Sequence, residues 1–147
     1  MNKYELELIF PTKEYKKEVE EYLQEFLDNG ENEIVGDRGL DRIRDFDKWL
    51  EKVQNDLSVD TIDKDRIPAT LYLTIRKSDK KIVGNLQIRH FLNEKLLNYG
   101  GHIGECIKFI LYIFVSTGAT APIINSMILQ FFYKSLFHII DTYTYRK

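Results

Sequence analysis

The side chains best suited to acid–base chemistry in this chain of 147 residues are its three histidines, His90, His102 and His138. The free pKa of imidazole lies near neutrality, so each could accept or donate a proton at physiological pH. None stands at a metal-ligand spacing from nearby carboxylates or from the only cysteine, Cys106. We therefore expect no metal site. The sequence also shows neither a Ser-His-Asp arrangement nor a phosphate-binding loop.

The lone cysteine and the overall charge limit the classes of protein to which the chain could belong. A single thiol excludes an internal disulfide bond and fits a reducing compartment, so we expect a cytoplasmic protein. Cys106 has no partner at a spacing typical of cysteine nucleophiles, so a small buried residue is its better interpretation. The net charge of −2 and the lack of a basic face argue against nucleic acid or an anionic membrane as partner.

Two runs of alternating residues predict a β-hairpin in the middle of the chain. The runs span 67–76 and 81–90 and are joined by a short polar link. Their alternation predicts one buried face, with the apolar positions Leu71, Leu73, Ile75, Ile82, Leu86 and Ile88 and with Gly84. A third strand is predicted from Gly100 onward, with Ile103 and Ile107 on one face.

The residues before the hairpin predict one strand and two helices. Glu5–Phe10 alternates and predicts the first strand. Apolar residues at helical spacing predict helices over 13–28 and about 41–56, and Asn29-Gly30 is a stop signal for the first of them. This order, followed by an antiparallel three-stranded meander, indicates the α+β class.

The chain changes character after Lys108, which divides it into residues 1–108 and an atypical segment, 109–147. The second part is apolar and aromatic, and Pro122 suits the first position of a helix. We expect that C-terminal apolar helix to be buried or incompletely covered. A lysine and a histidine interrupt it, which disfavours a membrane span, because a span needs about 20 apolar residues in a row.

Several short motifs in and after the hairpin carry a resemblance to a known family. They read Pro68-x-Thr70-x-Tyr72-x-x-x-Arg76, Ile82-Val-Gly84, Arg89-His90-x-Leu92-Asn93 and Gly100-Gly-His-Ile-Gly104. Together they resemble a bacterial branch of the GCN5-related N-acetyltransferase (GNAT) family, over about residues 6–108. The resemblance implies the first half of a GNAT fold and an acyl-CoA-dependent N-acetyltransferase, with acetyl-CoA as cosubstrate and a small-molecule or protein amine as acceptor.

The resemblance also implies roles for individual residues. Acetyl transfer needs a base that deprotonates the amine, and His90, His102 and Glu105 are the candidates. Arg89 and Asn93 would bind the acceptor. The alternative is that the two histidines, with Arg89 and Asn93, are polar residues at strand ends that fix the local geometry.

The family pairs its fourth strand with the pantetheine arm of the cofactor, and here that stretch is Cys106, Ile107 and Lys108. A glycine-rich turn that holds the pyrophosphate should follow, because backbone N–H groups at a helix N-terminus bind phosphates. Instead the chain continues with apolar residues, and Gly118 is the only glycine after Gly104. Two explanations stay open: out-of-frame translation of a longer gene, or a divergent domain whose last helix packs on the sheet.

Two other functions compete with the enzyme. A non-catalytic acetyltransferase remnant or protein-interaction module could use an exposed sheet edge to pair with another chain, and a homo-oligomer would be one such product. A weaker alternative is a membrane-associated protein anchored by Ile123–Ile140.

Overall fold

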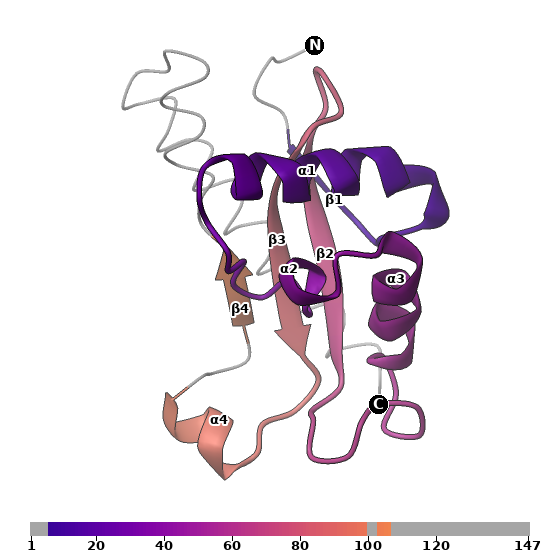
Figure 1. The fold of residues 1–147 in the computed structure, drawn as a ribbon. Helices are drawn as coiled ribbons and strands as arrows, with labels where there is room; N and C mark the ends of the chain where they lie inside the picture. Colours follow the sequence, from indigo (N-terminus) through magenta and orange to yellow (C-terminus); the bar gives the residue numbers. More distant parts are fainter. Residues whose placement is uncertain (1–5, 100–102, 107–147) are drawn as a thin grey trace.

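The computed structural model describes residues 6–99 and 103–106, which form an α+β unit with helices over one face of an antiparallel sheet (Figure 1). The sheet has four strands in the order β1-β2-β3-β4, and every neighbouring pair is antiparallel. The strands are β1 (Leu6–Ile9), β2 (Ala69–Arg76), β3 (Ile82–Arg89) and β4 (Ile103–Cys106). The predicted α+β class, first strand and hairpin are confirmed.

The first predicted helix forms as a 3-10 turn, η1 (Lys13–Tyr15), that continues into α1 (Lys16–Asp28). Its apolar stripe of Val19, Tyr22, Leu23 and Phe26 is buried against the sheet and α3 (Phe46–Asn55). The predicted stop is confirmed, because Gly30 has a φ of 75°. Its N–H donates to Leu27 O at 3.0 Å, and the N–H of Glu31 donates to Phe26 O at 3.0 Å. This pair of bonds satisfies the last carbonyls of the helix.

The second predicted helix is two helices instead of one over 41–56. They are α2 (Leu40–Ile43) and α3 (Phe46–Asn55), and Arg44 between them has a φ of 51°. The cause is Asp45, whose extended backbone and side chain cap α3 by accepting the Lys48 N–H at 3.1 Å. An N-cap residue cannot itself be helical, so a new helix begins there.

The hairpin buries both of its faces, so the prediction of one buried face is wrong. Leu71 pairs with Gln87 and Leu73 with Asn85, and these pairs share the side on which the helices lie. Leu86 and Ile88 lie on the opposite side with Leu8 and Tyr72. The two strands therefore direct their apolar residues to opposite faces of the sheet.

A β-bulge explains why Ile82 nevertheless joins the core under the helices. Thr74 pairs with Gly84 but Ile75 pairs with Ile82, which leaves Val83 as an extra residue in β3. A bulge shifts the alternation of a strand by one residue. Ile82 thus packs with Ile75 in the helix-side core, while Leu86 and Ile88 do not.

The chain after the hairpin is described only in part. A short helix, α4 (Glu94–Tyr99), precedes β4, and β4 confirms the beginning of the third predicted meander strand. The predicted domain segment 109–147, with its C-terminal helix and its candidate anchor Ile123–Ile140, lies outside the described residues. None of the helices within 6–99 is long and apolar enough to cross a membrane.

Candidate functional site: a polar cavity at the end of β3

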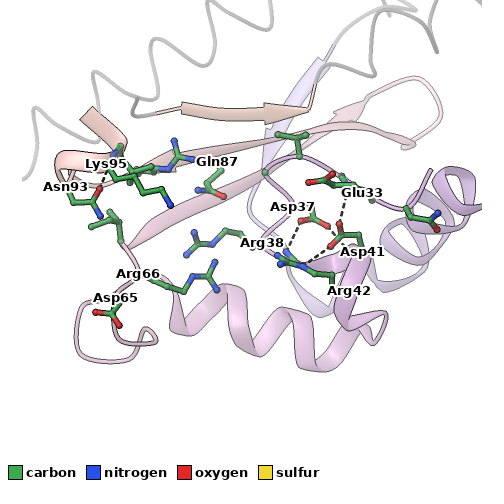
Figure 2. A pocket seen from close by; sticks show the side chains of 18 residues that line it. Glu33, Asp37, Arg38, Asp41, Arg42, Asp65, Arg66, Gln87, Asn93 and Lys95 are labelled. Carbon is green, nitrogen blue, oxygen red and sulfur yellow. Dashed lines mark hydrogen bonds and ion pairs between the residues drawn. The ribbon is translucent and has the colours of Figure 1, made fainter. Parts of the chain in front are cut away.

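A cavity of about 810 Å³ opens on the helix side of the sheet, beside the C-terminal end of β3 (Figure 2). Its walls come from residues 32–39 between α1 and α2, from two residues of α2, from 65–67 before β2, from β3 itself and from the residues around the start of α4. The charged side chains in these walls are Glu33, Asp37, Arg38, Asp41, Arg42, Asp65, Arg66, Arg89 and Lys95. Cations and carboxylates are almost equal in number, so their arrangement decides what the cavity can bind.

Two buried carboxylates at one end of the cavity hold the loop that forms its wall. The carboxylate of Asp37 accepts the N–H of Gly39 at 2.7 Å and the N–H of Asp41 at 2.8 Å. Asp41 Oδ2 accepts the N–H of Ile34 at 3.2 Å. Burial raises the pKa of Asp37, and its two backbone hydrogen bonds oppose that shift. These oxygens therefore satisfy backbone donors and shape the loop.

The same loop is fixed from below by side chains of the core. Trp49 of α3 is fully buried and donates its indole N–H to Asp37 O at 2.7 Å. Asn85 of β3 donates from Nδ2 to Val35 O at 2.9 Å and accepts the Tyr22 hydroxyl on Oδ1 at 3.1 Å. A buried amide is stable only when its donors and acceptors are paired, and Asn85 meets this condition through α1 and the loop together.

Arg38 carries its guanidinium from the same loop into the other end of the cavity. Its φ is 60°, and its side chain is 6% exposed. Nε and one terminal nitrogen lie 2.7 and 2.6 Å from Oδ2 of Asp56, and Lys52 Nζ lies 2.8 Å from the same oxygen. One buried carboxylate thus serves two cations.

The charges of two more guanidinium groups act on Arg38. Burial lowers the pKa of Arg38, the carboxylate of Asp56 opposes this shift, and the charges of Arg66 and Arg89 add to it. Figure 2 shows the side chains of Arg38 and Arg66 extending toward one another, with Lys95 on the same side of the cavity. We call Arg38, Arg66 and Arg89 the arginine cluster. Like charges repel, so an anion placed among them would be stabilised.

Two of the residues predicted to bind the acceptor, Arg89 and Asn93, line this cavity. The Oδ1 atom of Asn93 accepts the Leu96 N–H at 2.9 Å, so Asn93 also caps α4. His90 is not among the lining residues. Its ring atom Nε2 lies 2.9 Å from Thr70 Oγ1, and its backbone N–H donates to Pro68 O at 2.9 Å. His90 therefore joins the end of β3 to the start of β2.

The other predicted site residues lie on or after β4. Glu105 and Cys106 belong to β4, where their backbones pair with Leu86 and Asn85. His102, Ile107 and Lys108 lie outside the described residues. In the ranges 6–99 and 103–106, no group of three or more histidine, cysteine or acidic side chains could hold a metal ion.

Sequence reasoning missed the side chains that give the cavity its charge. No role was assigned from the sequence to the segments 30–40 and 58–66, yet they supply Arg38 and Arg66. The available signal was the repeated Asp-Arg pair at 37–38 and 41–42. An alternating charge pair in a loop is normally solvated, so only the fold could reveal that Arg38 is buried.

Comparison with known proteins adds no relative to this picture. No protein family model, no curated protein and no solved structure matches the chain.

Proposed function

We propose that this chain is an acyl-CoA-dependent N-acetyltransferase of the GNAT type, which transfers the acetyl group of acetyl-CoA to an amine bound in the polar cavity. The observation that carries this proposal is the position of the cavity. It lies beside β3 and is lined by Arg89 and Asn93, the two residues that the resemblance assigns to acceptor binding. The order of strand, helices and antiparallel meander is also the order that the resemblance implies.

The edge of the sheet supports a place for the cosubstrate. Within the described residues, β4 pairs with β3 on one side and with no strand on the other. An unpaired edge offers backbone N–H and C=O groups, which an extended amide-containing chain such as pantetheine can pair with. In the proposal, the stretch Cys106 to Lys108 supplies those groups, and a backbone N–H polarises the thioester oxygen.

The proton of the attacking amine must pass to a base. In the proposal, His102 or Glu105 takes this role, because His102 directly precedes β4 and Glu105 lies within it, the strand that would hold the thioester. His90, by contrast, is engaged with Thr70 and would position the neighbouring Arg89 rather than take the proton.

Calorimetric titration of the 147-residue chain with acetyl-CoA tests the proposal, with a known acetyltransferase as the positive control. We expect saturable binding, followed by release of free coenzyme A thiol when an amine acceptor is added. A folded chain, verified by circular dichroism, that binds no acetyl-CoA would overturn the enzyme.

The same strand edge favours a second candidate function. A non-catalytic remnant could use the free edge of β4 to pair with another chain, and Leu97 of the adjacent α4 is 70% exposed. Light scattering across a range of protein concentrations tests this alternative. Self-association together with a failure to bind acetyl-CoA would favour it, whereas a monomer that binds acetyl-CoA would overturn it.

A further inference from the structure

We propose that the arginine cluster binds an anionic group, a carboxylate or a phosphate, on the amine acceptor. This inference rests on the proposed function, because it names the class of substrate that the acetyltransferase would take. The acceptor would therefore be an amine that also carries an acidic group, rather than a simple alkylamine or a polyamine.

Asp56 and Asp63, the carboxylates that contact Arg38 and Arg66, do not balance the charge of these two side chains. Asp56 is 2% exposed and already serves both Arg38 and Lys52. Among the residues that the structure describes, the ion pair of Arg66 is a long contact of 3.8 Å with Asp63, whose side chain is 75% exposed. An exposed pair at that distance contributes little, so most of the charge of Arg66 stays available to a ligand.

The carboxylates at the other end, Asp37 and Asp41, contact the loop and Arg42 rather than the cluster. Both oxygens of Asp37 accept backbone N–H groups, and Asp41 accepts the N–H of Ile34. Figure 2 shows Asp37 and Asp41 on one side of the cavity and Arg66 and Lys95 on the other, with Gln87 between them. Figure 2 also shows Arg42 beside Asp41 and Asp65 beside Arg66, so each end carries both signs, with an excess of carboxylates at the first end and of cations at the second.

Guanidinium groups suit this task better than ammonium groups would. The planar fork of arginine donates two parallel hydrogen bonds to a carboxylate or phosphate, and such charge-assisted bonds are about twice as strong as neutral ones. Arg38 is held in place by Asp56 before any ligand arrives, so little side-chain entropy is lost on binding. The volume of about 810 Å³ exceeds that of one acidic group and leaves room for the rest of an amine.

Calorimetry with matched pairs of amines tests the inference without acetyl-CoA. The probes are phosphoethanolamine against ethanolamine, β-alanine against propylamine, and inorganic phosphate alone. We expect each acidic amine to bind at least about tenfold more tightly than its neutral partner, because one charge-assisted contact contributes about that factor. The two acidic probes also distinguish a phosphate site from a carboxylate site.

Variants of the two more exposed members identify the site. Arg66→Gln and Arg89→Gln should each weaken binding of the better acidic amine about tenfold. Arg38 is left intact, because its loss would leave Asp56 buried beside a single lysine. Lys64→Gln is the matched control: it removes one charge from the same loop, but Lys64 is exposed and does not line the cavity. That variant should change binding less than twofold, and melting temperatures should verify the fold of all three.

Several outcomes would overturn the inference. They are equal binding of acidic and neutral amines, unchanged binding in both arginine variants, no binding of any anionic probe, or phosphate binding as tightly as phosphoethanolamine. Failure of the proposed function looks different. Acidic amines that bind through the cluster to a chain that does not bind acetyl-CoA would overturn the enzyme and leave the anion site. Equal acetylation of neutral amines would overturn only the anion site.

Discussion

On the side of the sheet that the helices cover, β2 presents apolar side chains and β3 presents polar ones. β2 contributes Leu71 and Leu73, which pack into the core below α1 and α3. Their partners in β3 are Gln87, which lines the cavity, and Asn85, which donates to the loop at Val35 O. Where the paired residues of both strands are apolar, they pack directly into the core beneath the helices. Where one strand presents amides, the covering segment is a loop tied down by hydrogen bonds, and a cavity can persist.

The two halves of this side of the sheet differ in what holds them together. The core beneath α1 and α3 is stabilised by apolar burial, which is non-directional and tolerates small shifts. The cavity wall depends on single contacts such as Trp49 to Asp37, Asn85 to Val35 and Arg38 to Asp56. Each has strict geometry and a cost if one partner is lost. Substitutions can therefore separate the two halves by the size and pattern of their effects.

Trp49→Ala should have the largest effect, because Trp49 belongs to both halves. It removes the largest fully buried side chain and the donor to Asp37 O. Loss of a buried tryptophan and of a buried hydrogen bond together should lower the free energy of unfolding by about 4 kcal/mol or more. Urea denaturation measures this loss, and Trp49→Phe is the control. If the phenylalanine variant lost as much as the alanine variant, the hydrogen bond and not the packing would dominate.

Asp56→Ala should come next and should act on the cavity half. It leaves the buried guanidinium of Arg38 without its carboxylate, and breaking a buried pair costs about 3 kcal/mol or more. We expect a lower urea midpoint with an unchanged slope. Asp47→Ala is the control, because its ion pair with Lys16 is exposed and should contribute little to stability. Equal effects of the two would mean that Arg38 is solvated.

Tyr22→Phe should have a smaller effect, at the boundary between the halves. The substitution keeps the ring in contact with Phe26 but removes the hydroxyl that donates to Asn85 Oδ1. We expect a loss of about 1 kcal/mol in thermal or urea unfolding. Tyr15→Phe is the matched control, because Tyr15 is half-buried beside the core and no hydrogen bond of its hydroxyl contributes to the loop. A loss as large in the control would argue against the Asn85 contact.

The smallest effect concerns pH and contrasts a buried carboxylate with one in the hairpin turn. Burial raises the pKa of Asp37, whereas the hydrogen bond from Arg76 lowers the pKa of Asp79. The Asp79 contribution to stability is therefore present above the unfolded value of about 3.9 and is lost as pH falls through its lower folded pKa. Asp37 acts oppositely: its contribution is present below about 3.9 and is lost as pH rises through its higher folded pKa.

Carbon-13 NMR titration of the side-chain carboxyls checks both directions. Asp79→Asn should abolish the low-pH titration and leave that of Asp37 unchanged. A titration of Asp37 below that of Asp79 would contradict the contrast.

The sequence predicts those parts of the fold that local rules decide. The helix 13–28 was predictable because its apolar period and its glycine stop agree, and the strands were predictable from their alternation. The side of the sheet to which the apolar residues of β3 point was not predictable, because one bulged residue, Val83, reverses the alternation relative to β2. The break between α2 and α3 was missed because Asp45 could be an exposed helix residue as well as a cap.

The candidate site was predictable only where a motif marked it. Arg89 and Asn93 were chosen through the resemblance, and both line the cavity. Arg38 and Arg66 could not be chosen, because their proximity depends on two loops that meet only in the folded chain. Their chemistry follows from three-dimensional crowding of like charges, which leaves no pattern in a linear sequence.

Asp56 has a consequence for how motion near the cavity could be observed. Its carbonyl accepts the N–H of Ala69 at 2.9 Å, while its carboxylate holds Arg38 and Lys52. Asp56 thus closes the loop 57–68 through a hydrogen bond to the first residue of β2, and it also holds Arg38 in the wall of the cavity. Opening of that wall would release Asp56 and expose the Ala69 amide to solvent. The rate at which this amide exchanges with deuterium would therefore report how often the wall opens, and a ligand that holds the wall closed would slow the exchange.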